Sequence, residues 1–262
     1  MGVITNPLVL WAMGELEWLS YRSAHRLVGL SPGIVDGIAR RGVARARIAL
    51  IPNGCDLDIF AVPACAWRPE GVGADDLMAV FTGTHGIANG LDAVLNAAAE
   101  LKQRGRTDIK LVLIGDGKLK AGLQAHAQAE GLDNVIFHPP VGKQKLAGLM
   151  AATDVGMQIL ANVSAFYYGT SPNKFFDYLA AGLPVLNNYP GWLAEIIARH
   201  QCGYAVPPDD PAAFADALCH AADHRQELIA MGTRARELAE AEYNRELLAG
   251  RFVDCLEGSV VR

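Results

Sequence analysis

A short segment in the second half of the chain carries residues suited to binding a phosphorylated sugar. Ser171 is placed to cap a helix whose first residue is Pro172, which puts Asn173 and Lys174 in the first helical turn. A lysine there opposes the helix dipole, so a bound anion would make its charge favourable. Asp177 lies on the same helical face as Asn173, where a carboxylate can hold two sugar hydroxyls. Solvated surface charges are the plainer alternative.

Two glycine-rich loops are candidates for contact with phosphate. Residues 83–90 hold three glycines, which allow close backbone approach, and the helix behind them offers free N–H groups to an anion. Residues 115–117 begin like a dinucleotide fingerprint, but Lys120 stands where the third glycine is needed, and no P-loop motif is complete. A tight turn between strand and helix is the alternative for each loop. The residues concerned are Gly83, Thr84, His85, Gly86 and Asn89, and then Gly115, Asp116 and Gly117.

A third loop, residues 139–143, could bind a nucleobase. Two prolines stiffen its start, and Val141 is placed to lie against a flat ring while main-chain groups read the edge of that ring. Lys143 ends the loop and would flank the ribose. A plain turn is the alternative.

These loops all follow expected strands. Strands alternate with helices from Leu77 onward, which predicts an α/β fold with a doubly wound parallel sheet. Ligands bind such sheets at the carboxyl ends of the strands. The expected strands are Leu77–Thr82, Lys110–Ile114, Asn134–His138, Asp154–Ile159, Pro184–Asn187 and Gly203–Val206. A short strand-like run, His25–Leu30, precedes a helix that Ser31 can cap, that starts at Pro32 and that Gly42 ends. The other expected helices are Pro7–Arg22, Leu91–Arg104, Lys118–Glu130, Lys143–Ala151, Pro172–Ala181, Leu193–His200, Pro211–His220, Gln226–Glu242 and Arg245–Glu257.

The composition of the chain argues against a nucleic-acid-binding protein, a disulfide-linked or zinc-binding protein, and a membrane-spanning protein. The net charge of −5 argues against a nucleic-acid partner, because proteins that neutralise nucleic-acid phosphates are usually basic. Five cysteines without a C-x-x-C pair favour reduced thiols in the cytoplasm over disulfides or a zinc site. The apolar stretch Pro7–Leu19 is too short for a membrane span and contains Glu15 and Glu17, and no secretion signal is recognisable. We expect no metal or cofactor.

Four runs of the sequence resemble, in the right order, segments of the retaining nucleotide-sugar glycosyltransferases of family 4. They are IALIPNGCD at 48–56, FTGTHGIANGLDAVLNAA at 81–98, LVLIGDG at 111–117 and FFDYLAAGLPV at 175–185. The run SPNK at 171–174 resembles the branch that builds bacterial capsule, exopolysaccharide and O-antigen chains. Because several motifs occur together, the resemblance is specific.

The resemblance implies the GT-B fold, two Rossmann-like domains with the active site between them. Residues 1–52 would be the end of the N-terminal acceptor domain, 53–76 a linker, and 77–240 the whole donor-binding domain. Residues 241–262 would form a helix that returns toward the N-terminal domain. Most of the acceptor domain would then be absent.

The resemblance also implies an activity. A sugar would pass from a nucleoside diphosphate sugar, with UDP expected, to a saccharide or lipid-linked saccharide in polysaccharide synthesis, with retention. Lys174 would be catalytic by stabilising the leaving diphosphate. Membrane contact through Pro7–Leu19, at the inner face of the plasma membrane, is an alternative to core packing of that segment. The donor-binding set is Gly83, Thr84, His85, Gly86, Asn89, Gly115, Asp116, Gly117, Val141, Lys143, Thr170, Ser171, Pro172, Asn173 and Asp177.

The chain departs from the family pattern at two places. The family often has two glutamates separated by seven residues; Gly169 stands at the first and Asp177 at the second, where it would bind ribose. The first loop has His85 and Asn89 where the family commonly has arginine and lysine, so Lys174 and backbone N–H groups would replace that charge. A nucleotide-sugar epimerase of GT-B fold and a non-catalytic donor-binding fragment are the alternatives.

Overall fold

Six parallel strands form the main sheet, in the order β5-β4-β3-β6-β7-β8. The computed structural model describes residues 5–61 and 65–260, so the outermost ends of the expected domains and Pro63 of the linker lie outside it. The four central strands are almost wholly buried, as parallel strands covered on both faces must be. The strands are β3 (Leu77–Thr82), β4 (Ile109–Ile114), β5 (Val135–His138), β6 (Val155–Gln158), β7 (Val185–Asn187) and β8 (Gly203–Ala205).

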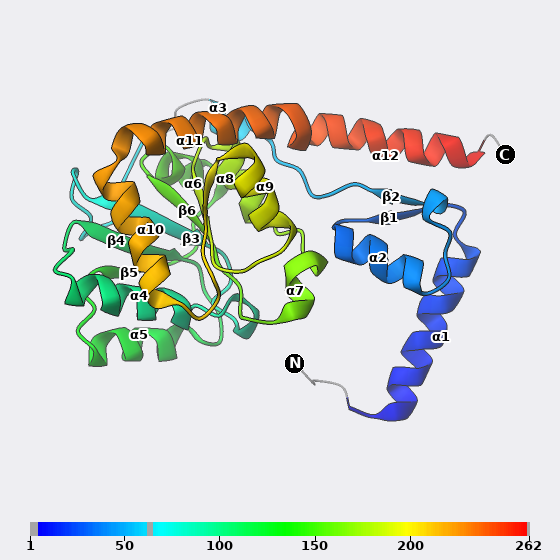
Figure 1. Cartoon of the computed structure of the whole chain (residues 1–262), viewed down its shortest axis with the longest axis horizontal. Coiled ribbons are helices and arrows are strands. Elements are labelled where there is room, and N and C mark those ends of the chain that lie inside the picture. The colour runs from blue at the N-terminus through cyan, green and yellow to red at the C-terminus, as the bar shows by residue number, and fades with distance from the viewer. Residues whose placement is uncertain (1–4, 62–64, 261–262) are drawn as a thin grey trace.

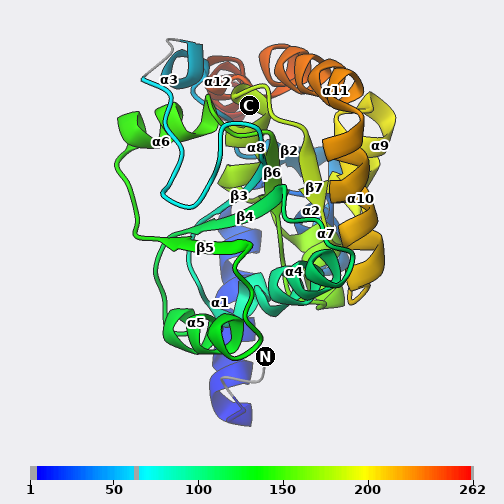
Figure 2. The ribbon, with the colours of Figure 1, turned by 90° about the vertical axis from the view of Figure 1, so that its left-hand side faces the viewer.

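Helices cover both faces of this sheet (Figure 2). Side chains alternate along β3, so Leu77 and Phe81 enter one core while Met78 and Val80 enter another. The first core takes residues from α4 (Asp92–Gln103), α5 (Lys120–Ala129) and α10 (Pro211–Asp223). Residues of the other face come from α6 (Lys143–Met150), α8 (Asn173–Ala180), α9 (Trp192–His200) and α11 (Arg225–Leu238).

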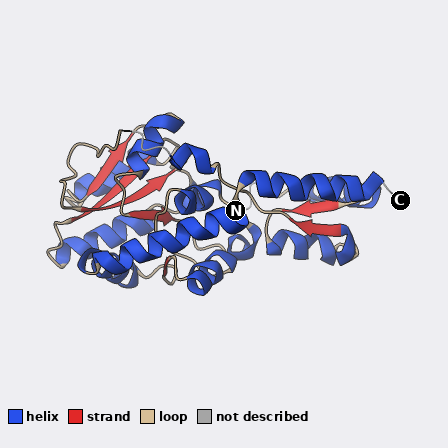
Figure 3. Ribbon diagram, turned by 90° about the horizontal axis from the view of Figure 1, so that it is seen from above, coloured by secondary structure: helices blue, strands red, loops and turns tan. Residues whose placement is uncertain are grey.

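A second, smaller sheet lies at the other end of the molecule (Figure 1). It pairs β1 (Leu27–Gly29) in parallel with β2 (Ile48–Leu50). In Figures 1 and 3 it lies between α2 (Pro32–Arg40) and α12 (Arg245–Val260), so the last helix returns beside the small sheet. The helix α1 (Pro7–Ser23) precedes β1 and has no buried residue.

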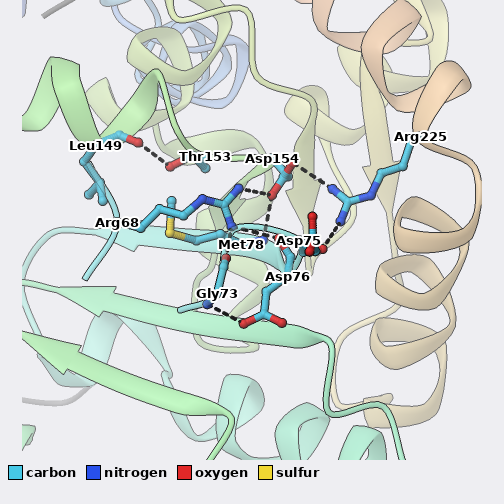
Figure 4. Close-up of polar contacts among 9 residues, drawn as sticks. All are labelled: Arg68, Gly73, Asp75, Asp76, Met78, Leu149, Thr153, Asp154 and Arg225. Atoms are coloured by element: carbon cyan, nitrogen blue, oxygen red, sulfur yellow. Dashed lines mark hydrogen bonds and ion pairs between the residues drawn. The ribbon is translucent and has the colours of Figure 1, made fainter. Parts of the chain in front are cut away.

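The connection between the two sheets runs from the end of β2 to the start of β3, and both of its ends are bonded to other parts of the chain. Near its start, the Cys55 N–H donates to the Tyr243 carbonyl at 2.9 Å, and the Arg245 N–H donates to the Cys55 carbonyl at 3.0 Å. Near its end, the Asp154 carboxylate pairs with Arg68 at 3.4 Å and with Arg225 at 2.7 Å (Figure 4). Asp154 directly precedes β6, so these ion pairs lie at the amino ends of the parallel strands and not at their carboxyl ends.

The expected elements agree closely with the structure. Each expected strand of the main sheet ends within one residue of the observed strand. Two helices were not expected: α3 (Leu57–Ala61), inside the expected linker, and α7 (Ser164–Gly169). Both are short and lack the repeated apolar spacing by which a helix is recognised. Within the described residues, no helix is long and apolar enough to cross a membrane.

Candidate functional site

The strand order creates a crevice at the carboxyl ends of β3 and β6. The chain passes from β3 outward through β4 to β5, and then returns to place β6 on the other side of β3. Ligands of open parallel sheets bind at such a reversal. The connection from β6 to β7, which contains Lys174 and Asp177, starts from this point, and so do the loops after β3 and β4.

A cavity of about 330 Å³ opens beside these loops. Five of the residues expected to bind the donor line it, and they come from three separate loops. Pro140 and Val141 of the third loop contribute to the lining, and Leu146 of α6 adds apolar surface. The lining residues are Thr82, Gly83, Thr84, Ile114, Gly115, Asp116, Pro140, Val141 and Leu146.

The first two loops cross each other so tightly that only glycine fits. Gly115 has φ +148°, and a Cβ atom there would lie 1.9 Å from the Gly83 carbonyl oxygen. Gly117 has φ +156°, and a Cβ atom there would lie 2.4 Å from the His85 carbonyl oxygen. The His85 N–H also donates to the Asp116 carbonyl at 2.8 Å. The two loops therefore form one rigid floor, which explains the glycines by close approach.

The His85 side chain lies beneath this floor. It is fully buried between Phe81 and Phe137, with ring centroids 6.2 Å from each. Neither ring nitrogen has a hydrogen-bond partner within the described part of the chain, and burial lowers the pKa of the imidazole. A neutral ring that supports the loops from below fits this position. Contact with a ligand would come from the loop backbone and not from the imidazole.

Lys174 bridges α8 and the first loop. Its Nζ donates to Asn89 Oδ1 at 3.1 Å and lies 3.9 Å from the centre of the Phe81 ring. A Cβ atom at Gly83 would lie 3.2 Å from this nitrogen, so the ammonium is next to the loop backbone. No acidic side chain pairs with it among the described residues, and burial lowers the pKa of Lys174 to about 7. The crevice therefore holds a cation that lacks an anion.

Asn89 ties the first loop to Lys174. Its Nδ2 donates to the Thr84 carbonyl at 2.6 Å, which closes the loop on itself. Its Oδ1 accepts from Lys174. Gly86 lies between Thr84 and Asn89 in the same closed loop, just before a short 3-10 turn. Asn89 thus braces the loop and orients the lysine.

The expectation that Ser171 caps α8, with Pro172 as its first residue, is wrong. Pro172 is the N-cap residue, with extended backbone and no capping side chain, and the helix begins at Asn173. Ser171 instead bonds across to the connection between the sheets: its Oγ accepts from the Asn53 N–H at 3.1 Å, and its carbonyl accepts from Asn53 Nδ2 at 2.6 Å. The hydroxyl that was expected to cap α8 therefore bonds to Asn53, a distant residue that local sequence spacing cannot predict. Lys174 remains in the first helical turn, as expected.

Tyr178 fixes α8 against the sheet. Its hydroxyl accepts from the Thr82 N–H at 3.0 Å at the end of β3. Gly156 in β6 makes room for the ring, because a Cβ atom there would lie 2.4 Å from it. This anchor is on the same helix as Lys174 and Asp177, so it sets the position of both side chains in the crevice.

Asp177 lies in a cluster of charged residues. Burial and the neighbouring Asp56 carboxylate raise the pKa of Asp177 to about 6, and the charges of Lys143 and Arg245 oppose that rise. Asp56 itself pairs with Lys143 at 3.7 Å and with Arg245. The cluster brings together Lys143 and Asp177, two residues expected near the ribose.

The remaining expected residues lie around α7. The Thr170 hydroxyl donates to the Phe166 carbonyl at 2.9 Å, and the Thr170 carbonyl accepts from Trp192 Nε1 at 2.8 Å. Asn173 is exposed at the start of α8. Gly169 ends α7, and a Cβ atom there would meet nothing within 4 Å. Packing therefore does not require glycine at this place.

The sequence comparison decides the family. The family model described as "Glycosyl transferases group 1" matches residues 77–224, which span all of the main sheet and both glycine-rich loops. The chain belongs to this family. The family assignment agrees with the resemblance noted in the sequence, and it places the crevice, Lys174 and Asp177 within the matched region.

Curated glycosyltransferases are among the relatives of this chain. It is 30% identical over 242 residues to the D-inositol 3-phosphate glycosyltransferase of Streptomyces avermitilis, covering 87% of this chain and 50% of that one. It is 29% identical over 226 residues to the D-rhamnosyltransferase WbpZ of Pseudomonas aeruginosa, covering 84% and 55%. The chain therefore spans about half the length of the curated relatives it matches.

Solved structures confirm the GT-B type of fold. Sucrose-phosphate synthase of Thermosynechococcus elongatus matches with a TM-score of 0.78 at 21% identity, covering 98% of this chain and 64% of that one. Anabaena HepE, crystallised with UDP-glucose, matches with a TM-score of 0.75 at 16% identity, covering 92% and 65%.

Two charged residues of the site were not expected from the sequence. Asp56 is the last residue of the family-like run 48–56, so this run could have pointed to it. Arg245 begins α12, and no motif pointed to it. Both come from segments that connect the two sheets, whose meeting beside Asp177 is a property of the fold.

Proposed function

We propose that this chain supplies the donor-binding part of a retaining glycosyltransferase that uses a UDP-sugar. The observation that supports this most is Lys174, a partly buried cation with no acidic partner in the described part of the chain. It lies beside two interlocked glycine loops at the reversal of the strand order. A leaving nucleoside diphosphate would provide the missing anion. The UDP-glucose bound to HepE, a protein of the same fold, supports the choice of donor.

The chemical step needs stabilisation of charge on the leaving group. As the bond between sugar and diphosphate breaks, negative charge accumulates on the diphosphate, and preorganised donors lower the barrier most. Lys174 would supply a cation, and backbone N–H groups of the first loop would supply neutral donors. Asn89 would keep the lysine aimed at that charge, because it bonds to both the loop and the ammonium.

The nucleoside would occupy the cavity beside these groups. Val141 and Pro140 would contact the uracil ring, and the backbone of residues 115–117 would face the ribose and phosphates. Asp177 would accept from the two ribose hydroxyls, with Lys143 at the edge of the site. The cavity, the Asp177 carboxylate and Lys174 would then take the base, the ribose and the diphosphate, respectively.

The acceptor and the place of reaction belong to the same proposal. A saccharide or lipid-linked saccharide in polysaccharide synthesis is supported by relatives such as the D-rhamnosyltransferase WbpZ. The protein would act in the cytoplasm, at the inner face of the plasma membrane when the acceptor is lipid-linked. The exposed apolar side chains of α1, among them Trp11 and Leu16, support such a contact.

Isothermal calorimetry with UDP tests the donor site. We expect UDP to bind equally well with and without EDTA, because Lys174 would take the diphosphate charge and the described residues form no group of three or more His, Cys, Asp or Glu that could hold a metal ion. UMP, which lacks the second phosphate, should bind more weakly and serves as the matched ligand control. Absence of UDP binding would refute the donor site, and loss of binding with EDTA would refute its independence of metal.

A further inference from the structure

The helix α1 exposes large apolar side chains along most of its length. None of its residues is buried, and eight large apolar side chains between Leu8 and Leu19 are exposed. Two of them are the tryptophans Trp11 and Trp18, which are 65% and 46% exposed. Indole rings are favoured at the boundary between lipid and water, because the ring is apolar while its N–H still bonds to water. An apolar surface of this extent marks a contact with another molecule.

The residues around α1 carry a positive charge that contrasts with the rest of the chain. Residues 1–50 contain six arginines and three acidic residues, whereas the whole chain has a net charge of −5. Arg41 pairs with Glu17 of α1. Arg45 pairs with Asp36 of α2, so two of the three acids are already neutralised. The other four arginines have no acidic partner in the described part of the chain: Arg22, Arg26, Arg40 and Arg47.

Contacts place several arginines against the apolar helix. The Arg22 guanidinium lies over the Trp18 ring, 5.1 Å from its centre. Arg41, which directly follows α2, lines a hollow of about 410 Å³ together with Trp11 and Trp18. Arg47 donates to two backbone carbonyls just past the last residue of α1. In Figure 1, this end of the molecule lies far from the main sheet, so the sheet does not cover it. Guanidinium groups therefore border the apolar side chains of α1.

We propose that α1 and the arginines around it form a surface that binds a membrane containing anionic lipids. The inference deepens the place of action in the proposed function, on which it rests for the lipid-linked acceptor. Apolar and indole side chains of α1 would enter the head-group region, and the arginines would meet the negative charge of the lipids. The cytoplasmic leaflet, where the proposed function places the reaction, is the anionic one.

The charge decides between an anionic membrane and the other molecules that could cover α1. A neutral membrane would accept the apolar side chains and leave the arginines without a counter-charge. A second copy of the chain would bring the same arginines, so like charges would meet across the contact. An anionic lipid surface satisfies both the apolar side chains and the arginines, with a gain of about fivefold in affinity for each arginine near that surface.

Flotation of the full chain with phospholipid vesicles tests this surface. One set of vesicles contains only phosphatidylcholine, which is neutral, and the other contains phosphatidylcholine mixed with anionic phosphatidylglycerol. We expect the chain to bind the anionic vesicles at least about tenfold more strongly than the neutral ones. This preference should decrease as salt is added, because dissolved ions screen exposed charges.

Two double variants separate the charge from the apolar contact. Arg22→Gln with Arg40→Gln removes two exposed arginines and should weaken binding to anionic vesicles by about 25-fold, while binding to neutral vesicles stays the same. Trp11→Gln with Leu16→Gln should weaken binding to both kinds of vesicle. Arg104→Gln is the matched control, because Arg104 lies on α4 of the main domain and pairs there with Asp216.

Several outcomes would overturn the proposal. Equal binding to neutral and anionic vesicles would do so, and so would unchanged binding of the arginine double variant. Loss of binding in excess glycerol phosphate at constant ionic strength would show that the arginines take a free phosphate and not a lipid surface. Oligomers that stay unbound in the presence of anionic vesicles would show that a second copy covers α1 instead.

Calorimetry with UDP on the same samples keeps this inference distinct from the donor site. A chain that binds UDP but not anionic vesicles overturns only the membrane surface. A chain that binds anionic vesicles but not UDP overturns only the donor site. The arginine double variant should bind UDP as the wild type does, because the substituted residues lie outside the crevice.

Discussion

Lys174 lies in a position that disfavours its own positive charge. Lys174 is partly buried and has no acidic partner among the described residues, which disfavours its charged form, and the contacts with Asn89 and the Phe81 ring compensate only in part. A diphosphate would complete the pairing. Such conflicts between stability and local charge are typical of functional sites.

Replacing Lys174 by methionine should separate these two effects. Because the pKa of Lys174 is about 7 in the folded protein, below its value in the unfolded chain, its cost is fully present below pH 7 and disappears as the pH rises through the unfolded pKa. Lys174→Met should therefore raise the free energy of unfolding by about 1–2 kcal/mol at mildly acidic pH, and by less at alkaline pH. It should also weaken UDP binding by about 1.5–3 kcal/mol.

Urea unfolding across the pH range, together with calorimetry, measures both effects of Lys174→Met. Asn89→Ala is a useful companion variant, because it keeps the cation and removes its orienting partner. Unchanged stability at all pH values, or unchanged UDP affinity in the folded variant, would contradict the assignment of Lys174.

At the scale of elements, the interlocked loops support the whole crevice. Their crossing depends on Gly115, where a side chain would meet the Gly83 carbonyl at 1.9 Å in a backbone region that disfavours other residues. Gly115→Ala should lower the free energy of unfolding by about 2–4 kcal/mol. Urea unfolding measures this loss.

Gly122 offers the matched control for Gly115. It lies in the middle of α5, and a Cβ atom there would meet nothing within 4 Å. Gly122→Ala should raise the free energy of unfolding by about 0.5–1 kcal/mol, because alanine restricts the unfolded chain and favours a helix. If both substitutions lowered the free energy of unfolding by similar amounts, the loop crossing would not be the reason that position 115 requires glycine.

Local patterns were sufficient to predict most elements of the fold. Apolar runs such as Leu77–Thr82 alternate with amphipathic helices, and this alternation alone predicts a parallel sheet and its ligand-binding edge. It also predicted the loops that line the cavity. Long-range contacts could not be predicted in the same way: Ser171 bonds to Asn53, 118 residues away, instead of capping α8. Arg245 pairs with Asp56 only because α12 starts beside the connection.

At the scale of the whole molecule, α1 is exposed along its length, whereas the central strands of the main sheet are buried. The helix α1 carries large apolar side chains around its whole circumference, yet none of its residues is buried. A helix that is apolar on all sides normally lies inside a protein. Leu8, Trp11 and Leu16 are 74%, 65% and 67% exposed, so this surface can be covered by another molecule without rearranging the rest of the fold.

In solution without lipid, where no membrane covers this surface, we therefore expect the chain to self-associate through α1 as its concentration rises. Exposed apolar surface of this extent promotes contact between copies. The double substitution Trp11→Gln and Leu16→Gln should shift the molecule toward monomer in sedimentation velocity. Its free energy of unfolding should change by less than about 0.5 kcal/mol, because neither side chain is packed. Ile229→Gln is the control, since Ile229 is an equally exposed apolar residue on α11, at 63%. A wild-type chain that stays monomeric, or a double variant that loses stability, would show that α1 is not the associating surface.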